Sequence, residues 1–119
     1  MKIQSSIYRD KLELCDSNGE LVKELPFTIN ITALADTVLH KQRQLTKVDQ
    51  SDLEALGRSF IELLEAIFGK AITDELLDYY QKDYIVMITD LTPVLTQELL
   101  PLFDKHRKNA INARKKVKK

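Results

Sequence analysis

The segment from residue 53 to 67 carries the pattern that most restricts how this chain can fold. Its apolar side chains recur at spacings of three and four, which is the period of a helix with one buried face. Ser51 and Glu54 have the spacing of a capping box at its start, and Gly69 is suited to its end. Gly57 either lets another helix approach closely or has no structural role. The predicted helix buries Leu53, Leu56, Phe60, Leu63, Leu64 and Ile67.

A helical period returns after this segment and continues almost to the end of the chain. Thr73 is placed to cap a helix, and apolar side chains keep helical spacing over residues 76–102. Two prolines interrupt the run. Pro93 either kinks one long helix or begins a new one, and Pro101 would kink or break a helix interior. We expect helix to continue past both and to fray before the last residue.

The first thirty residues have a different pattern, which predicts a β-hairpin. Residues 7–14 and 21–25 alternate imperfectly between apolar and polar side chains, and Asn18-Gly19 lies between them. Asn-Gly is a strong hairpin signal because both residues tolerate positive φ. An isolated hairpin is marginal in water, so we expect it to lie on the helices or to pair with another chain.

The connection from the hairpin to the first helix is predicted from single residues. We expect Pro26 to end the second strand, because proline cannot donate to a strand ladder. Residues 27–31 would then be an extended link or a third short strand, and Thr32 would cap a helix over residues 33–45.

Together these elements predict an α+β fold, mainly α, in which an N-terminal β-hairpin precedes about four helices and the last helix is long. The 119 residues provide one core and one domain. Within that single domain, residues 1–31 form the hairpin and link, residues 32–104 the helical body, and residues 105–119 a basic helical tail.

The net charge of zero conceals a strong asymmetry. Eight of the 18 basic residues and none of the 18 acidic ones lie in residues 105–119, so the body carries about eight negative charges and the tail eight positive ones. This tail is either a solvated helix end, where cations suit the helix dipole, or a segment that binds acidic protein surfaces or nucleic acid. Its basic residues are Lys105, Arg107, Lys108, Arg114, Lys115, Lys116, Lys118 and Lys119.

The residue types that carry catalysis or metal binding are sparse. Cys15 is the single cysteine, His40 and His106 lie far apart, and there is no glycine-rich phosphate-binding motif. We therefore expect no enzyme, no metal site and no cofactor. No run of about 18 apolar residues and no signal peptide is present, and a lone cysteine suits a reducing compartment, so we expect a cytoplasmic protein without a membrane span.

A cluster of aromatic residues is the best candidate for a binding site. Tyr79, Tyr80 and Tyr84 are flanked by acidic residues, which repel phosphate, so core packing or a protein interface is favoured over base stacking. We expect these tyrosines to contact a protein partner together with Lys105, Arg107, Lys108, Arg114, Lys115 and Lys116.

Residues 52–104 resemble the helical part of small tail assembly chaperones from long-tailed phages and prophages of Gram-positive bacteria. The likeness is carried by the Asp-Leu-Glu-Ala-Leu opening at 52–56, the Ala-Ile-Phe-Gly helix end at 66–69, the pairs Tyr79-Tyr80 and Asp83-Tyr84, and the Lys-rich terminus. It extends over residues 50–119, and the first fifty residues match in layout only.

The resemblance implies a non-catalytic protein of the host cytoplasm that binds the long, helical tape measure protein and assists assembly of tail tube subunits on it. It also implies self-association. The alternative class is a small nucleic-acid-associated accessory protein that uses the basic tail, although only Asn109 and Asn112 could read bases there. An enzyme with an unrecognised site is a third class.

Overall fold

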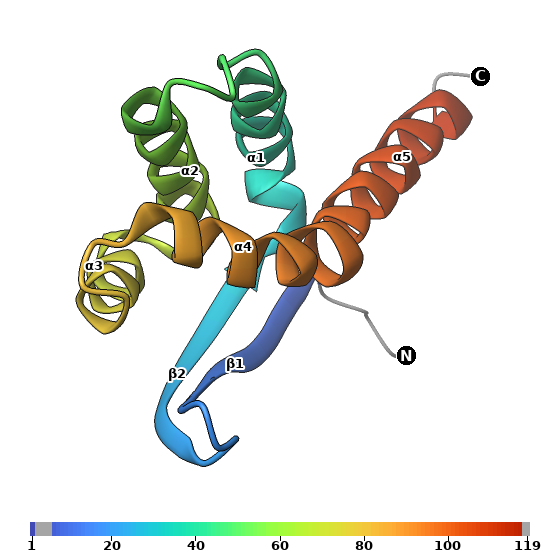
Figure 1. Cartoon of the computed structure of the whole chain (residues 1–119). Coiled ribbons are helices and arrows are strands. Elements are labelled where there is room, and N and C mark those ends of the chain that lie inside the picture. Colours follow the sequence, from blue (N-terminus) through green and yellow to red (C-terminus); the bar gives the residue numbers. More distant parts are fainter. Residues whose placement is uncertain (2–5, 118–119) are drawn as a thin grey trace.

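The chain folds as an α+β protein, mainly α, which confirms the predicted class. A computed structural model describes the backbone of residue 1 and of residues 6–117, and the side chains of that range except residue 110 and residues 113–117. A two-stranded antiparallel sheet comes first, followed by helices that pack on one of its faces (Figure 1). The elements are β1 (Ile7–Cys15), β2 (Leu21–Asn30), α1 (Ile31–Thr46), α2 (Leu53–Phe68), α3 (Lys70–Tyr79), α4 (Tyr84–Val94), a π-helical turn η1 (Leu95–Leu99) and α5 (Leu100–Val117).

The second strand of the hairpin is longer than predicted. Pro26 does not end it but pairs with Lys11 inside the ladder, and the expected link over residues 27–31 is largely the second half of β2. Proline is tolerated here because β2 is an edge strand, on which an N–H can point away from its partner. The turn prediction is confirmed, since Gly19 has φ +81° and its amide donates to the carbonyl of Asp16.

Three predicted helix caps were wrong, and in two of these cases a neighbouring side chain accepts the capping hydrogen bond instead. Asn30, not Thr32, caps α1, because its side chain accepts from the amide of Ala33 at 3.3 Å. Asp52, not Ser51, caps α2. The third case, Thr73, is buried inside α3.

The residues around the α2 and α3 caps account for the last two corrections. Ser51 instead donates both its amide and its hydroxyl to the carboxylate of Asp49 in the turn before the helix, and Asp52 accepts from the amide of Ala55. Helix α3 begins at Lys70 because Gly69, at φ +85°, already turns the chain between α2 and α3. One turn later, the hydroxyl of Thr73 donates a hydrogen bond to the carbonyl of Gly69 at 2.8 Å.

The prolines in the last third of the chain do not divide the helix. Pro93 lies inside α4, and the helical backbone continues through η1 into α5, whose second residue is Pro101. The amide of Leu100 donates to the carbonyl of Leu95, five residues earlier, so the turn before Pro101 is widened. Figure 1 shows the run changing direction between α4 and α5, which is the bend expected of a π turn next to a proline.

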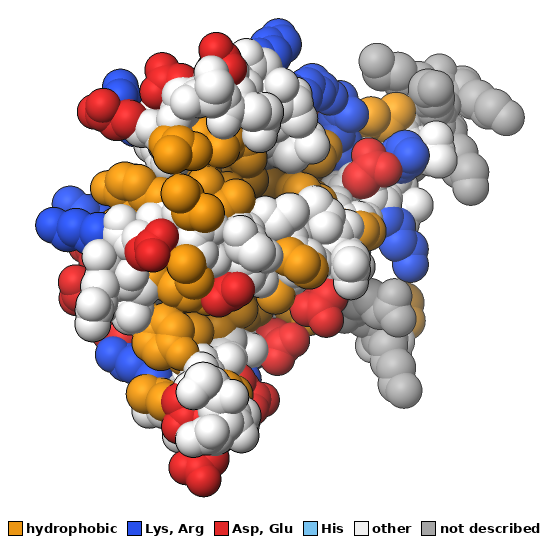
Figure 2. Space-filling view, viewed as in Figure 1, with side chains coloured by type: hydrophobic (Ala, Val, Ile, Leu, Met, Phe, Trp, Pro, Cys, Tyr) orange, Lys and Arg blue, Asp and Glu red, His pale blue; other side chains and the backbone are white. Residues whose placement is uncertain are grey.

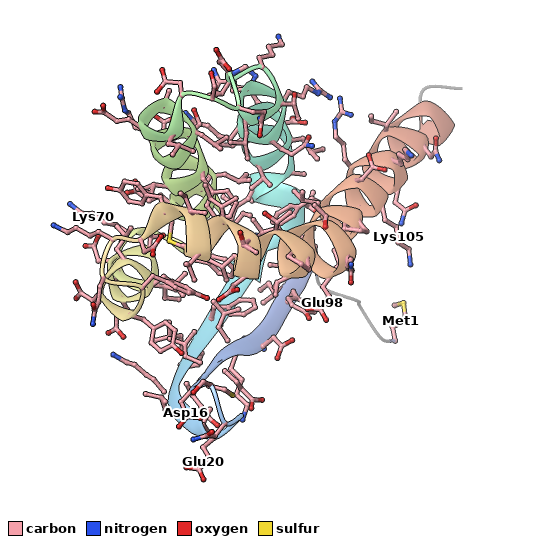
Figure 3. All side chains as sticks on the ribbon, in the orientation of Figure 1. Met1, Asp16, Glu20, Lys70, Glu98 and Lys105 are labelled. Atoms are coloured by element: carbon pink, nitrogen blue, oxygen red, sulfur yellow. The ribbon has the colours of Figure 1, made fainter. Side chains whose placement is uncertain are left out.

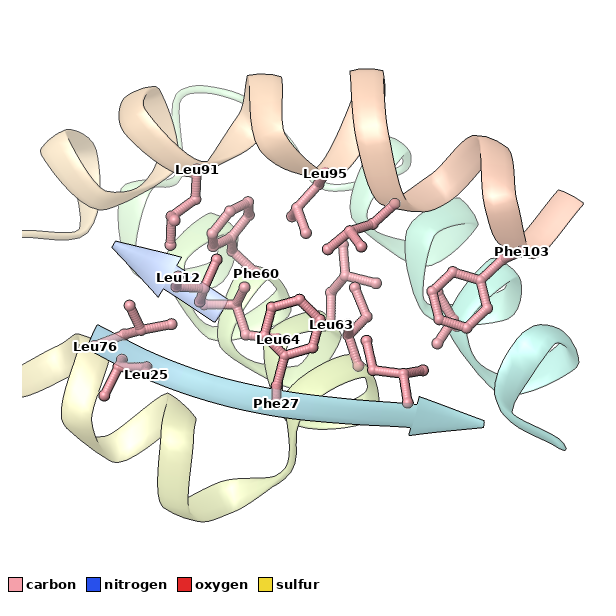
Figure 4. Packing of buried hydrophobic residues seen from close by; sticks show 14 of the residues in the cluster. Leu12, Leu25, Phe27, Phe60, Leu63, Leu64, Leu76, Leu91, Leu95 and Phe103 are labelled. Carbon is pink, nitrogen blue, oxygen red and sulfur yellow. The ribbon is translucent and has the colours of Figure 1, made fainter. Parts of the chain in front are cut away.

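One core joins the hairpin to every helix. Leu12 and Leu25 of the hairpin, Phe60 of α2, Leu91 of α4 and Phe103 of α5 are all buried and point into the same interior (Figure 4). The body is compact, as expected of a soluble protein. By length and composition alone the helical stretch from residue 84 to 109 could also cross a membrane, and 22% of its apolar window is buried inside the protein. Here every fourth residue of the stretch lies in the core: Met87, Leu91, Leu95, Leu99 and Phe103.

Candidate protein-binding surfaces

Two of the three predicted tyrosines lie together at the end of α3. The rings of Tyr79 and Tyr80 meet edge to face with centroids 5.1 Å apart, and the Tyr79 hydroxyl donates to the backbone carbonyl of Cys15 at 2.6 Å. Burial raises the pKa of Tyr80, and the charge of Asp90 and a hydrogen bond to it add to the effect. These two tyrosines therefore tie α3 to the hairpin and to α4.

Tyr84 has a different role from its two neighbours in sequence. It lies in the first turn of α4 and packs against Gly57 of α2, where a Cβ atom would come within 2.8 Å of the Tyr84 ring. The predicted aromatic cluster is therefore divided between two places. The pairing also decides between the two interpretations of Gly57, because its missing side chain is what lets α4 approach α2.

The basic residues of the predicted site are partly occupied by the protein's own acids. Arg107 on α5 pairs with Asp36 on α1 at 3.1 Å, and Lys108 pairs with Asp104 one turn away at 3.0 Å. Lys105 points away from the body into solvent (Figure 3). The side chains of Arg114, Lys115 and Lys116 lie outside the described part, although their backbone continues α5.

A groove that the sequence did not reveal runs between α1, α2 and the η1–α5 junction. We call it the apolar groove after its smaller part, and its larger part also carries Arg43 and Asp104. It consists of two adjoining cavities of about 150 and 410 Å³, both bordered by Gln42, Thr96 and Leu100. Figure 2 shows hydrophobic side chains gathered in the hollow between the α1–α2 pair and the long helix. The lining of the smaller cavity is mainly apolar, with Leu45 and Phe60 among its residues. In the sequence, Gln42 interrupts the apolar stripe of α1, and that interruption is the signal from which the groove could have been predicted.

A second hollow, which we call the β1 groove, lies on the other side of the long helix. It has a volume of about 500 Å³ and is bounded by β1 residues 10–15, by the α3 tyrosines and by α4 and η1. Asp90 and Glu98 contribute acidic side chains, and Leu91 and Val94 contribute apolar ones. Figure 3 shows Glu98 on the side of the long helix that faces the hairpin.

The described side chains include no group of three or more His, Cys, Asp or Glu that could hold a metal ion. Cys15 is exposed at the end of β1. Its backbone carbonyl is held by Tyr79, while His40 and His106 lie on α1 and α5. The arrangement offers two grooves on opposite sides of the long helix.

Comparisons of the chain with protein-family models, with curated proteins and with solved structures gave no match.

Proposed function

We propose that this protein is a non-catalytic assembly chaperone of phage or prophage tails, and that its apolar groove holds a helical segment of the tape measure protein. The groove is the observation that carries the proposal. It lies between packed helices and is lined by Leu39, Leu45 and Leu100, which suits the apolar face of an amphipathic helix. The resemblance of residues 52–104 names such a partner, because tape measure proteins are long and helical.

The charges of the structure favour this proposal over nucleic-acid binding. Asp36 and Asp104 already pair with Arg107 and Lys108, so these cations are less free to release counterions from a phosphate backbone. Acidic side chains also surround the tyrosines that could have stacked on bases. A binding titration with single- and double-stranded nucleic acid at low salt tests the alternative, which predicts tight binding that falls steeply as salt rises.

The proposal predicts that a tape measure protein is encoded beside this chain, and co-expression of the two tests it. We expect a stable complex that keeps the tape measure protein soluble, and failure of the two to co-purify from either direction would refute the idea. Tail tube protein can be added to the same assay as the second expected partner.

Thr96→Glu and Gln97→Glu form a matched pair for placing the contact. Both residues are exposed on η1 and both changes add one negative charge, but only Thr96 lines the groove. A charge buried against an apolar helix is costly, so Thr96→Glu should weaken the complex by about tenfold or more while Gln97→Glu leaves it nearly unchanged. Equal effects would place the contact elsewhere.

A further inference from the structure

The outer edge of β1 has backbone groups that point into the β1 groove. The amide of Ile31 donates to the carbonyl of Ser6 at 3.0 Å, which makes residues 6 and 31 a hydrogen-bonded pair of the antiparallel ladder. Such pairs alternate along the strands, so residues 8, 10, 12 and 14 bond to β2. The backbone groups of Arg9, Lys11 and Glu13 consequently face away from β2, toward the open edge.

This edge is closed at two points and open between them. The Tyr79 hydroxyl occupies the carbonyl of Cys15, and the carboxylate of Asp10 accepts from the amide of Lys11 at 2.8 Å. Among the described residues, the amide of Glu13 and the carbonyls of Lys11 and Glu13 have no partner on this side. Proteins usually protect such an edge, because unpaired strand groups are a template for another strand.

The side chains beside the open edge determine which residues an added third strand would need. Asp10, Asp90 and Glu98 line the groove, and Leu91 and Val94 lie between the last two along the helix. Figure 2 shows acidic side chains over the long helix and between it and the hairpin. The lining includes one cation, Lys11, which pairs with Glu24 on β2 instead. An incoming segment therefore meets negative charge next to apolar surface.

We propose that the β1 groove binds an extended, Lys- or Arg-bearing segment of a partner protein, which pairs with the open edge of β1 as a third strand. Alternate side chains of such a strand face the same way, so basic residues two apart lie along the acidic wall. A cation that takes the carboxylate of Asp10 also releases the amide of Lys11, which lengthens the edge available for pairing. Binding of the partner's cations therefore favours strand pairing, and strand pairing places those cations beside the acidic residues.

The chain's own basic tail is a poorer occupant than a separate extended segment. Residues up to Val117 continue α5 as a helix, which cannot supply strand hydrogen bonds, and α5 leads away from the hairpin (Figure 1). The β1 groove also lies on the opposite side of the long helix from the apolar groove. The inference is therefore independent of the proposed tape measure site.

The test uses a fluorescent peptide with the sequence Lys-Val-Lys-Val-Lys-Val-Lys, a Glu-for-Lys counterpart and a backbone N-methylated copy. We expect the Lys peptide to bind at low salt and to shift the amide resonances of Arg9, Lys11 and Glu13. The Glu peptide should not bind, and the N-methylated copy should bind about tenfold more weakly because its strand donors are blocked. No binding at low salt, or equal binding of the N-methylated copy, overturns the proposal.

Two matched pairs of variants locate the site on the protein. Glu13→Pro removes an outward amide from the edge of β1, and Thr28→Pro removes one from the opposite edge, where Pro26 is already accommodated. Only the first should abolish the resonance shifts. Glu98→Lys reverses a groove charge, whereas Asp74→Lys reverses an exposed charge on α3 outside the lining.

Glu98→Lys should weaken the Lys peptide about fivefold or more, and Asp74→Lys should do so far less. Equal effects of the two charge reversals would show unspecific attraction and would refute the site. Resonance shifts confined to α1 and η1 would place the peptide in the apolar groove instead, and shifts confined to α5 would place it on the tail. Either of those results also overturns the proposal, and the N-methylated peptide keeps it testable if Glu13→Pro fails to fold.

Discussion

Replacing Gly57 by alanine should destabilise this protein, although alanine is the better helix former. An added Cβ atom would lie 2.8, 2.9 and 3.2 Å from Cδ2, Cγ and Cβ of Tyr84. Cβ is fixed to the backbone, and Cδ2 and Cγ move only if the packed Tyr84 ring leaves its place, so either α4 shifts away from α2 or that ring is displaced. Overpacking of this kind costs about 1–3 kcal/mol.

The gain that opposes this cost is small. Gly→Ala inside a helix contributes about 1 kcal/mol of helix propensity. Because relief of the clash shifts α4 or displaces a packed ring, we place its cost at the upper end of that range and expect a net loss of about 1–2 kcal/mol. For a chain of this size that corresponds to a fall in Tm of roughly 5 °C or more.

Chemical denaturation followed by circular dichroism measures the effect, and a double-mutant cycle identifies its cause. In a Tyr84→Ala background the two closest contacts are gone and only the 3.2 Å contact to Cβ remains, so Gly57→Ala should there stabilise the protein by up to about 1 kcal/mol. Glu65→Ala, at an exposed position of the same helix, should stay within about 0.5 kcal/mol of wild type. If Gly57→Ala stabilises both backgrounds equally, the close approach of α4 and α2 is refuted.

Three further predictions concern single side chains. Asp52→Ala should lower the unfolding free energy by about 1 kcal/mol and Ser51→Ala by much less, as measured by urea denaturation, because Asp52 is the observed cap. Tyr79→Phe should cost about 1 kcal/mol and speed hydrogen exchange near Cys15, since it removes the bond to that carbonyl. Because the folded-state pKa of Tyr80 lies above its ordinary value of 10.0, the stability it contributes is present below that pH and lost above it, so Tyr80→Phe should flatten the alkaline decline in a pH series of melts.

The elements that rest on repeated patterns were predictable from the sequence. The stripe of α2 and the Asn18-Gly19 turn each combine several residues that favour one structure. The structure confirms the turn and most of the stripe, but Leu53, in the first turn of α2, is exposed rather than buried. The caps were less predictable because each depends on one residue among several similar candidates. Asn30 and Asp52 lie within two residues of the chosen Thr32 and Ser51, and only the backbone geometry separates them.

The long helix bends beside Pro101, as a proline predicts, but the form of that bend follows from the core. Five core residues from Met87 to Phe103 are spaced by four, and each step of four overshoots one α-helical turn by about 40°. A straight α-helix would therefore turn Phe103 away from the core. The π turn widens the helix where the drift has accumulated, and it also accommodates Pro101. The course of this helix is therefore set by core contacts spread over several turns, which the preferences of single residues do not predict.

The same helix explains why the candidate sites could not be found from sequence alone. Asp90, Val94 and Glu98 point to the β1 groove, while Thr92 and Thr96, on the opposite side, border the apolar groove. In the sequence each set looks like part of an ordinary exposed helix face. The sets line grooves only because the hairpin packs on one side of the helix and α1 and α2 pack on the other. The two proposed sites therefore share one helix but lie on opposite sides of it. Thr96→Glu should for this reason be assayed with the Lys peptide as well as with the tape measure protein. Loss of tape measure binding with retained peptide binding would show that the two sites are separable, as the opposite faces of the helix require.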